Sequence, residues 1–417
     1  MAFSFNTSLS GLNANSNALN VVGNNIANAN TVGFRSSTIS FMDVFADSRG
    51  ARLNGAGNPL QIGNGVQTGA VQTNFKQGSL NEADSPLQAA IQGNGFFVVK
   101  NPDGTSGYTR GGNFTVDKQG YLVAPGGSKV LGYLGQNGII PPGAALTALQ
   151  LPIGQTIAPQ VTTQASLRMN LNAGSATGSV FHAPVQVYDS RGTAHSLDLT
   201  FTRQSDGSFD MTAALDGNPV QSGGAPGSPV NFSFDSNGNL TAPGTLSIVP
   251  DQSQLDGATL PSIAINLREI NADGTPGAFY ITSYARPSAV ASTTQDGFSA
   301  GELFAASVDS DGNIYGSFSN GQSRILGQYA LATFNSSDGL QRLGGNMFTE
   351  TLASGQANIG SPNSGGRGSI AGGYLEQSNV NITNEFVELI EAQRGFQANS
   401  RVINSLNQTF QDILQIV

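Results

Sequence analysis

The side chains in this sequence that could do chemistry are carboxylates and amides grouped around glycines. Residues 309–313 read DSDGN, which places oxygens at alternate positions before a glycine, as at the start of a calcium loop. The twelfth position of such a loop supplies a bidentate carboxylate, but here it is Asn320. Residues 235–239 (DSNGN) and 103–104 (DG) have the same composition, which tight hairpin turns also favour. We therefore predict turns at these places and no metal site.

The other groups that could support catalysis form no complete set. His182 and His195 could pair across neighbouring strands, but no third metal ligand accompanies them. The GNG at residues 93–95 opens a strand, whereas a dinucleotide fingerprint opens a helix. There is no lysine-bearing phosphate loop and no serine elbow with a histidine downstream. Carboxylates are numerous enough for a glycosidase pair, but a sequence cannot place two of them in one cleft. We predict no catalytic residues and no cofactor.

Composition excludes further classes of function. The chain has 417 residues and a net charge of -9, and it has no basic stripe for nucleic acid. Cysteine is absent, which removes disulfides, thiolate zinc sites and cysteine nucleophiles. No apolar run approaches the ~18 residues that span a bilayer, and the N-terminus lacks the basic and apolar regions of a cleaved secretory signal. We predict no membrane insertion and, if the chain is exported, export without cleavage.

The two ends of the chain carry an apolar residue at every seventh position. A seam with this period has to be buried against another helix, although an isolated apolar stripe is usually the inner face of an ordinary core helix. The period of seven, its presence at both termini and the absence of charge from residues 1–34 favour helices that join copies of the chain. The N-terminal positions are Leu12, Leu19 and Ile26, with Phe5 and Leu9 beside them, and the C-terminal ones are Ile382, Leu389, Phe396, Ile403, Phe410 and Val417.

The same pattern predicts the details of both helices. Gly33 is a plausible C-cap of the first helix, and Asn381 or Thr383 is the N-cap of the last. Gly11 lies inside the first helix, as does Gly23, and glycines at such positions indicate that another backbone comes close. The polar face of this helix is rich in asparagine, and alone in water the segment needs partners to fold. Its candidate channel-lining residues are Asn13, Asn17 and Asn20.

The middle of the chain reads as β structure in nested layers. A buried strand covers residues 95–99, and residues 114–116 and 121–123 form a hairpin. The segments SKVLG (128–132) and SRILG (323–327) each follow a turn, which suggests two halves of one β domain split by an insert. The fold class is therefore mainly β, with nested sandwich- or barrel-like domains and terminal helices that pair as a coiled coil. The predicted parts are a helical domain (1–34 and 378–417), a connector (35–74 and 360–377), a split β domain (75–157 and 288–359) and an inserted β domain (158–287).

The two ends also resemble a known family. Residues 16–35 (SNALNVVGNNIANANTVGFR) closely resemble the N-terminal signature of bacterial flagellar rod and hook proteins. The tail resembles the matching C-terminal signature in SNVN (378–381), EFVELI (385–390) and QRGFQAN (393–399). The strand GFFVV (95–99) with YTRGGNF (108–114) is similar to the shared β domain. Rod members are shorter and have little or no insert, so the insert favours the hook members.

The resemblance implies an exported structural subunit that polymerises into a curved, flexible tube and links rod to filament as a universal joint. It implies that the terminal helices form the inner wall and the β domains the outer layers. The implied partners are further copies of the chain, the rod, the hook cap, the hook–filament junction proteins and the flagellar type III export apparatus. The implied location is the extracellular hook of the flagellum.

The residues that we assign to contacts between subunits are the large apolar residues of the two ends. Their burial would drive polymerisation, at ~1.5–3 kcal/mol for each fully buried side chain, less the entropy of ordering. Two alternatives stay open: a distal rod subunit, and a secreted β-rich module that binds glycan or calcium. The assigned residues are Leu9, Leu12, Leu19, Val22, Ile26, Ile382, Phe386, Leu389, Phe396, Ile403, Leu406, Phe410 and Val417.

Overall fold

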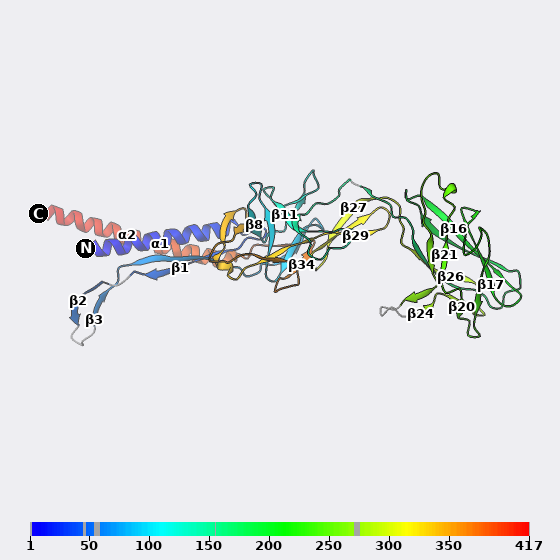
Figure 1. The fold of residues 1–417 in the computed structure, drawn as a ribbon. Coiled ribbons are helices and arrows are strands. Elements are labelled where there is room, and N and C mark those ends of the chain that lie inside the picture. The colour runs from blue at the N-terminus through cyan, green and yellow to red at the C-terminus, as the bar shows by residue number, and fades with distance from the viewer. Residues whose placement is uncertain (1, 45–46, 54–58, 155, 271–275, 417) are drawn as a thin grey trace. The chain divides into compact units, whose positions relative to one another are not determined.

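The computed structural model of the chain describes residues 2–44, 47–53, 59–154, 156–270 and 276–416. It divides into two compact units. Unit 1 comprises residues 1–153, 305–317 and 323–417, and unit 2 comprises residues 154–304 and 318–322. Most elements are strands, with one long helix at each end of the chain (Figure 1). The predicted class, mainly β with paired terminal helices, is confirmed.

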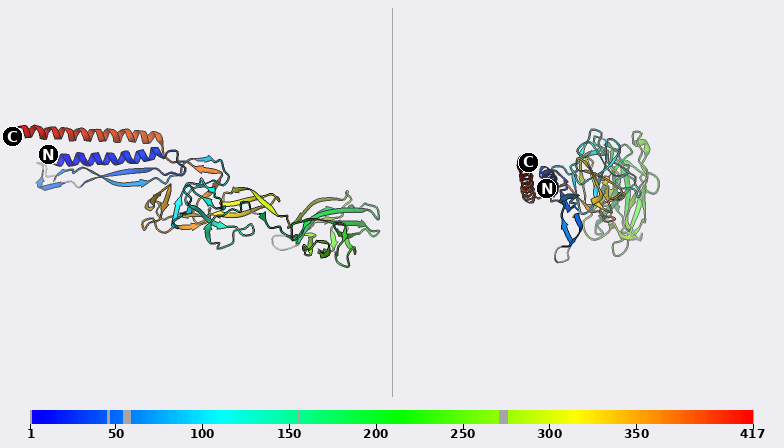
Figure 2. Two further views of the ribbon diagram at one scale, coloured as in Figure 1. Left: turned by 90° about the horizontal axis from the view of Figure 1, so that it is seen from above. Right: turned by 90° about the vertical axis from the view of Figure 1, so that its left-hand side faces the viewer.

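The helical part of unit 1 is an antiparallel pair, α1 (Ala2–Ala27) and α2 (Ile382–Ile416), beside a β-hairpin. Both ends of the chain lie at the same end of this pair (Figure 2). The hairpin strands β1 (Ser37–Asp43) and β4 (Val66–Thr73) pair antiparallel and pack on α1. Between them in sequence lie β2 (Asp47–Leu53) and β3 (Pro59–Ile62), which pair with each other.

The β region of unit 1 is built around β7 (Phe96–Lys100), which is buried on both faces. Phe97 and Val99 face one apolar core, whereas Phe96 and Val98 face another. This explains the continuous apolar run that marked residues 95–99 as a buried strand, and the predicted hairpin is β9 (Thr115–Val116) with β10 (Leu122–Val123). The sheet path around β7 is β27 (Gly301–Val308), β28 (Asn313–Phe318), β29 (Ser323–Tyr329), β11 (Lys129–Leu134), β7, β8 (Ser106–Thr109), β32 (Met347–Thr349) and β31 (Gln341–Gly344), and β12 (Leu146–Ala148), β30 (Leu331–Thr333) and β33 (Asn358–Gly360) join it laterally.

Strands from before and after the insert are neighbours in this sheet. β11 carries the SKVLG segment and β29 the SRILG segment, and the two pair antiparallel with Gly132 opposite Tyr329. The residues after β29 also return to the start of the β region through two short ladders. These are β5 (Leu80–Glu82) with β35 (Tyr374–Glu376), and β6 (Ala89–Gln92) with β34 (Ser369–Gly372).

Unit 2 has one apolar core to which two sheets contribute, as in a β-sandwich. Alternate residues of its strands point inward, for example Leu197, Leu199 and Phe201. β26 lies after the predicted insert boundary at residue 287 but pairs with β14 here. One sheet has β21 (Leu246–Ile248), β22 (Ile263–Asn266), β14 (Gln164–Asn170), β25 (Ile281–Thr282) and β26 (Ala289–Gln295); the other has β15 (Val180–Tyr188), β16 (Ala194–Arg203), β17 (Phe209–Leu215), β18 (Asn218–Pro219), β19 (Val230–Phe234) and β20 (Leu240–Ala242). The remaining pairs are β13 (Thr156–Ile157) with the start of β27, and β23 (Arg268–Ile270) with β24 (Pro276–Phe279).

Candidate assembly site

The ends of the two helices are defined by local chemistry. The Asn381 side chain accepts hydrogen bonds from the backbone N–H groups of Thr383 (3.1 Å) and Asn384 (3.3 Å), so Asn381 is the N-cap of α2. The C-cap prediction for Gly33 is wrong, because α1 already ends at Ala27. Gly33 has a φ of +69°, and a Cβ there would lie 2.5 Å from the backbone nitrogen of Gly111. It therefore permits a close approach of two backbones.

Small and polar residues take part in the contact between α1 and α2. The buried residues of α1 include Ala18, Val22 and Asn25, and those of α2 are Glu385 and Ala392. The large apolar residues with the predicted period lie at other positions, and most of them are half-buried. On α1 they come one residue later than the contact positions, and on α2 three residues earlier, so they flank the contact. At about 100° per residue, the displacement around the helix is about 100° on α1 and about 60° on α2.

The assigned subunit-contact residues are therefore only partly covered within one chain. Val22 is buried, whereas Leu12, Leu19, Ile26, Leu389, Phe396, Ile403 and Leu406 are half-buried. The exposed members are Leu9 (40%), Ile382 (46%), Phe386 (49%) and Phe410 (40%), and Val417 lies outside the described residues. Soluble proteins rarely leave such a contiguous row of large apolar side chains in water. We name the α2 row the apolar stripe: Ile382, Phe386, Leu389, Phe396, Ile403 and Phe410.

Asn25 and Glu385 form the one charged contact of the helix pair among the interactions the structure describes. The Asn25 amide donates to both Glu385 carboxylate oxygens at 3.1 Å and also to the Ser37 carbonyl oxygen at 2.7 Å. Burial raises the pKa of Glu385, and the hydrogen bonds from Asn25 offset part of this rise. Glu385 thus lies in the first turn of α2 and also pairs with α1.

Below the helices, a buried ion cluster ties distant segments together. Arg35 donates to the Glu376 carboxylate at 2.8 Å, and the Gly78 N–H donates to the same oxygen at 2.8 Å. Arg110 lies 3.5 Å from the other carboxylate oxygen. The side chains of Arg35 and Glu376 are fully buried, and burial together with the nearby Arg35 lowers the pKa of Arg110 to about 10. Two guanidinium groups thus share one carboxylate.

Asn379 adds a second connection between the chain segments where the helices meet the β region. Its side-chain oxygen accepts from the Ser36 N–H at 2.7 Å, and its amide donates to the Asn74 carbonyl oxygen at 2.7 Å. The sequence pointed to neither Glu376 nor Arg110 as a structural group. The only signal was Arg35, which is the first charged side chain after 34 uncharged residues.

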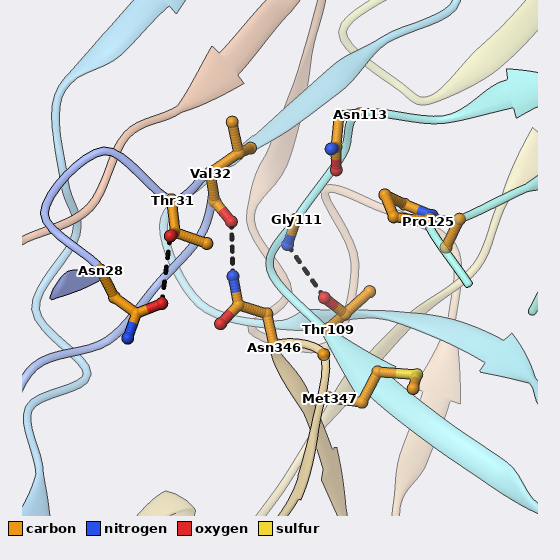
Figure 3. Close-up of a pocket in the computed structure, with 11 residues that line it drawn as sticks. Asn28, Thr31, Val32, Thr109, Gly111, Asn113, Pro125, Asn346 and Met347 are labelled. Atoms are coloured by element: carbon orange, nitrogen blue, oxygen red, sulfur yellow. Dashed lines mark hydrogen bonds between the residues drawn. The ribbon is translucent and has the colours of Figure 1, made fainter. Parts of the chain in front are cut away.

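A small pocket lies where the chain leaves α1 (Figure 3). Its volume is about 270 Å³, and Asn346 crosses it to donate to the Val32 carbonyl oxygen at 2.8 Å. Its wall also contains Asn28, Thr31 and Thr109. No residue that lines it is ionisable, so the pocket offers no group for acid–base catalysis.

The groups that first suggested chemistry have local structural roles. The Asp309 carboxylate accepts from the backbone N–H groups of Asp311 (2.9 Å) and Asn313 (2.8 Å), which confirms the predicted turn. The two histidines do not pair with each other. His182 contacts Asp198, and His195 contacts aspartates through both ring nitrogens. No group of three potential ligands among the described residues could hold a metal ion.

His195 lies between two carboxylates of unit 2. Its Nδ1 is 2.6 Å from Asp216 and its Nε2 is 3.3 Å from Asp189. Burial disfavours the imidazolium, but the hydrogen bonds to both aspartates outweigh it and raise the pKa of His195. Burial likewise opposes ionisation of Asp216, but its hydrogen bonds with His195 and the Ser196 N–H lower its pKa. The three side chains are a stabilising cluster of the sandwich.

The asparagines expected to line a channel are exposed on α1. Asn13 and Asn20 are exposed, and Asn17 donates to the Thr68 hydroxyl of the hairpin at 3.2 Å. Asn17 is thus partly used by the fold, while Asn13 and Asn20 face outward. No helix in the described part of the chain has the length and apolar character needed to span a bilayer.

Family models match most of the chain. The Flagella basal body rod protein family matches residues 5–35, and the Flagellar hook protein FlgE/F/G D1 domain matches residues 90–166. The Flagellar basal body protein FlaE D2 domain matches residues 162–298, and the C-terminal domain of the Flagellar basal body rod FlgEFG protein family matches residues 371–416.

Individual proteins match over nearly their full length. The chain is 32% identical to the flagellar hook protein FlgE of Salmonella typhimurium over 427 residues, which covers 99% of this chain and 100% of that protein. It is 30% identical to FlgE of Escherichia coli, with 99% of each chain covered. A crystal structure of Helicobacter pylori FlgE2 has a TM-score of 0.52 at 15% identity, covers 71% of this chain and 100% of that chain, and supports the fold alone.

Proposed function

The chain belongs to the flagellar hook protein family, and we propose that its copies join in the hook through the apolar stripe of α2, which one chain leaves only partly covered. It is a structural subunit that self-assembles into this part of the flagellum. The full-length similarity to hook proteins does not favour a distal rod subunit, nor does it favour a secreted glycan- or calcium-binding module.

The observation that carries the proposal is the exposure of large apolar side chains beside a seam that is already closed. Ile382, Phe386 and Phe410 each expose 40–49% of their surface. Burying the remainder of these three contributes about 2–4 kcal/mol per copy, before the cost of association. Ala18 and Ala392 are already buried within one chain, so we infer that the exposed part of the stripe is covered by α1 or α2 of other copies.

The finer assignments rest on the same geometry. We place the terminal helices at the inner wall of a tube, with Asn13 and Asn20 facing its channel and Asn17 beside them. Neutral amides would line such a channel without binding transiting chains through charge. The partners that follow are other copies, the rod, the hook cap, the hook–filament junction proteins and the type III export apparatus. The location that follows is the extracellular hook, reached without a cleaved signal.

Phe386→Glu tests the stripe, with Asn384→Glu as its matched control. The two residues lie two positions apart near the N-terminus of α2, both are exposed, and each change adds one negative charge. Successive positions differ by about 100°, so Asn384 lies nearly opposite Phe386 on the surface of α2. We expect the Phe386→Glu chain to fold with unchanged circular dichroism but to form no polymer by electron microscopy and to restore no motility to a strain that lacks its hook protein. Asn384→Glu should polymerise. Polymerisation of Phe386→Glu at the wild-type concentration would contradict the proposal.

A further inference from the structure

The seam between α1 and α2 contains a reciprocal exchange of asparagine and glycine. A Cβ added to Gly11 of α1 would lie 2.9 Å from the Asn399 amide nitrogen of α2. A Cβ added to Gly395 of α2 would lie 2.5 Å from the Asn15 amide oxygen of α1. Each asparagine therefore occupies space that only a glycine on the opposite helix leaves free.

Each asparagine is also fixed to its own helix. The Asn15 amide donates to the Gly11 carbonyl oxygen at 2.7 Å, and the Asn399 amide donates to the Gly395 carbonyl oxygen at 3.0 Å. Both side chains thus fold back by one helical turn and lie flat against their own backbone. The two Gly-x-x-x-Asn segments face each other in opposite directions, so each supplies the glycine that the other asparagine needs.

The same register holds along the whole seam. Moving from Gly11 to Asn25 along α1 covers about 21 Å, and the matching move along α2 runs from Asn399 to Glu385. At this end Asn25 hydrogen-bonds the Glu385 carboxylate. Midway, Ala18 and Ala392 are both buried and fall opposite each other in this register.

A shift of one helix along the other would be costly. A shift of one or two turns would place Asn399 against a side chain of α1 instead of Gly11. It would also move Glu385 away from Asn25 and leave a buried carboxylate without its donor, which is strongly unfavourable. We propose that this exchange is a register lock, which selects α2 of the same chain as the partner of α1 and leaves the apolar stripe for other copies.

The lock rests on the proposed function in one respect, namely that the stripe joins copies. The register lock itself concerns which helix pairs with α1 inside one chain, and in which register. The base of the pair supports this, because the Arg35–Glu376 contact and the Ser36–Asn379 hydrogen bond hold the two chain segments together where the helices meet the β region.

Two glycines of the same helix provide a matched test. Gly11 faces Asn399, whereas a Cβ added to Gly23 would meet no atom within 4 Å. Either change to alanine raises the intrinsic helix propensity equally. We expect Gly23→Ala to polymerise at the wild-type concentration or below it, and Gly11→Ala to need a concentration roughly tenfold higher because the seam is overpacked. Adding Asn399→Ala to Gly11→Ala removes the clashing side chain and should restore much of the loss.

A disulfide reports the register in the full-length monomer, which has no cysteine of its own. Cysteines introduced by Ala18→Cys and Ala392→Cys should form a bond within one chain in the wild-type and Gly23→Ala backgrounds. The yield should fall several-fold with Gly11→Ala and recover with Asn399→Ala. Equal yields in the Gly11→Ala and Gly23→Ala backgrounds, or bonds between chains, would overturn the register lock. If the yields follow the expected order but Gly11→Ala polymerises as well as Gly23→Ala, the lock stands but assembly does not depend on it. Failure of the proposed assembly surface is shown separately, by polymerisation of Phe386→Glu.

Discussion

Glu376→Gln should weaken unit 1 far more than an ordinary loss of one surface charge. Among the described residues, Glu376 is the only carboxylate in contact with Arg35 and Arg110, and all three side chains are buried. The amide can still accept from Arg35 and Gly78, but it leaves two buried guanidinium groups without a counter-charge. Breaking a buried ion pair in this way costs about 3–5 kcal/mol. For a unit of this size the midpoint of thermal unfolding should fall by roughly 6–20 °C.

Calorimetry of the full-length chain is a suitable assay, because it can follow the unfolding of both units in one sample. Unit 2 contains none of the three residues, so its transition should stay in place and serve as an internal reference. Glu82→Gln is the matched control. Glu82 lies on β5, the strand that pairs with β35, and it is exposed, so its loss should cost less than about 1 kcal/mol.

The result that would refute the buried cluster is an unchanged midpoint for Glu376→Gln. Water would then reach the two arginines, and the cluster could not hold the chain segments at the base of the helices. A shift of the unit 2 transition would contradict the assignment of Glu376 to unit 1. A large effect of Glu82→Gln would show that the loss of any carboxylate in this ladder is harmful.

Two further predictions concern charge. His195 has a pKa raised above its ordinary 6.5, so the stabilisation it gives unit 2 is complete below pH 6.5 and is lost as the pH rises through the folded value. Asp216 has a pKa lowered below 3.8, so its contribution is present above pH 3.8 and is lost as the pH falls through the folded value. Urea unfolding at several pH values should show both losses of stability, and His195→Gln should remove the one at high pH. Asn13→Lys, which places a cation on the face proposed to line the channel, should slow export of later subunits, and unimpaired filament growth would count against the channel assignment.

The strands could be predicted from the sequence where apolar pattern and turn chemistry agree. Phe96 to Val99 are buried on both faces of one sheet, so the sequence of β7 is a continuous apolar run, which predicts a buried strand. The turn at Asp309 could be predicted because its carboxylate accepts from backbone groups two and four residues later, which is a local interaction.

For the helix pair, the sequence predicted the seven-residue apolar period but not the residues of closest contact. Leu12 and Leu19 stand out as large apolar residues, whereas Gly11 and Ala18 come one position earlier: Gly11 faces Asn399 of α2, and Ala18 is buried. A pattern of large side chains marks where burial is favourable, but the closest approach of two helices is decided by which residues are small. The sequence gives no means of ranking these two effects.

The buried ion cluster could not be predicted at all. Glutamate on a short strand is usually exposed, and the partner of Glu376 lies 341 residues away at Arg35. Only the fold brings these residues together, and a single sequence carries no sign of that pairing. The same holds for Asn25 and Glu385, which are 360 residues apart.

The most direct test of the central claim is the reactivity of a thiol in the stripe before and after assembly. A chain with Phe386→Cys, mixed as a small fraction with the wild-type chain, can be labelled with a maleimide in the monomer and in the polymer. Phe386 exposes 49% of its surface in one chain, so the monomer should react readily. We predict strong protection in the polymer, because a neighbouring copy covers the stripe. Equal labelling of monomer and polymer would contradict the claim that copies join through this surface.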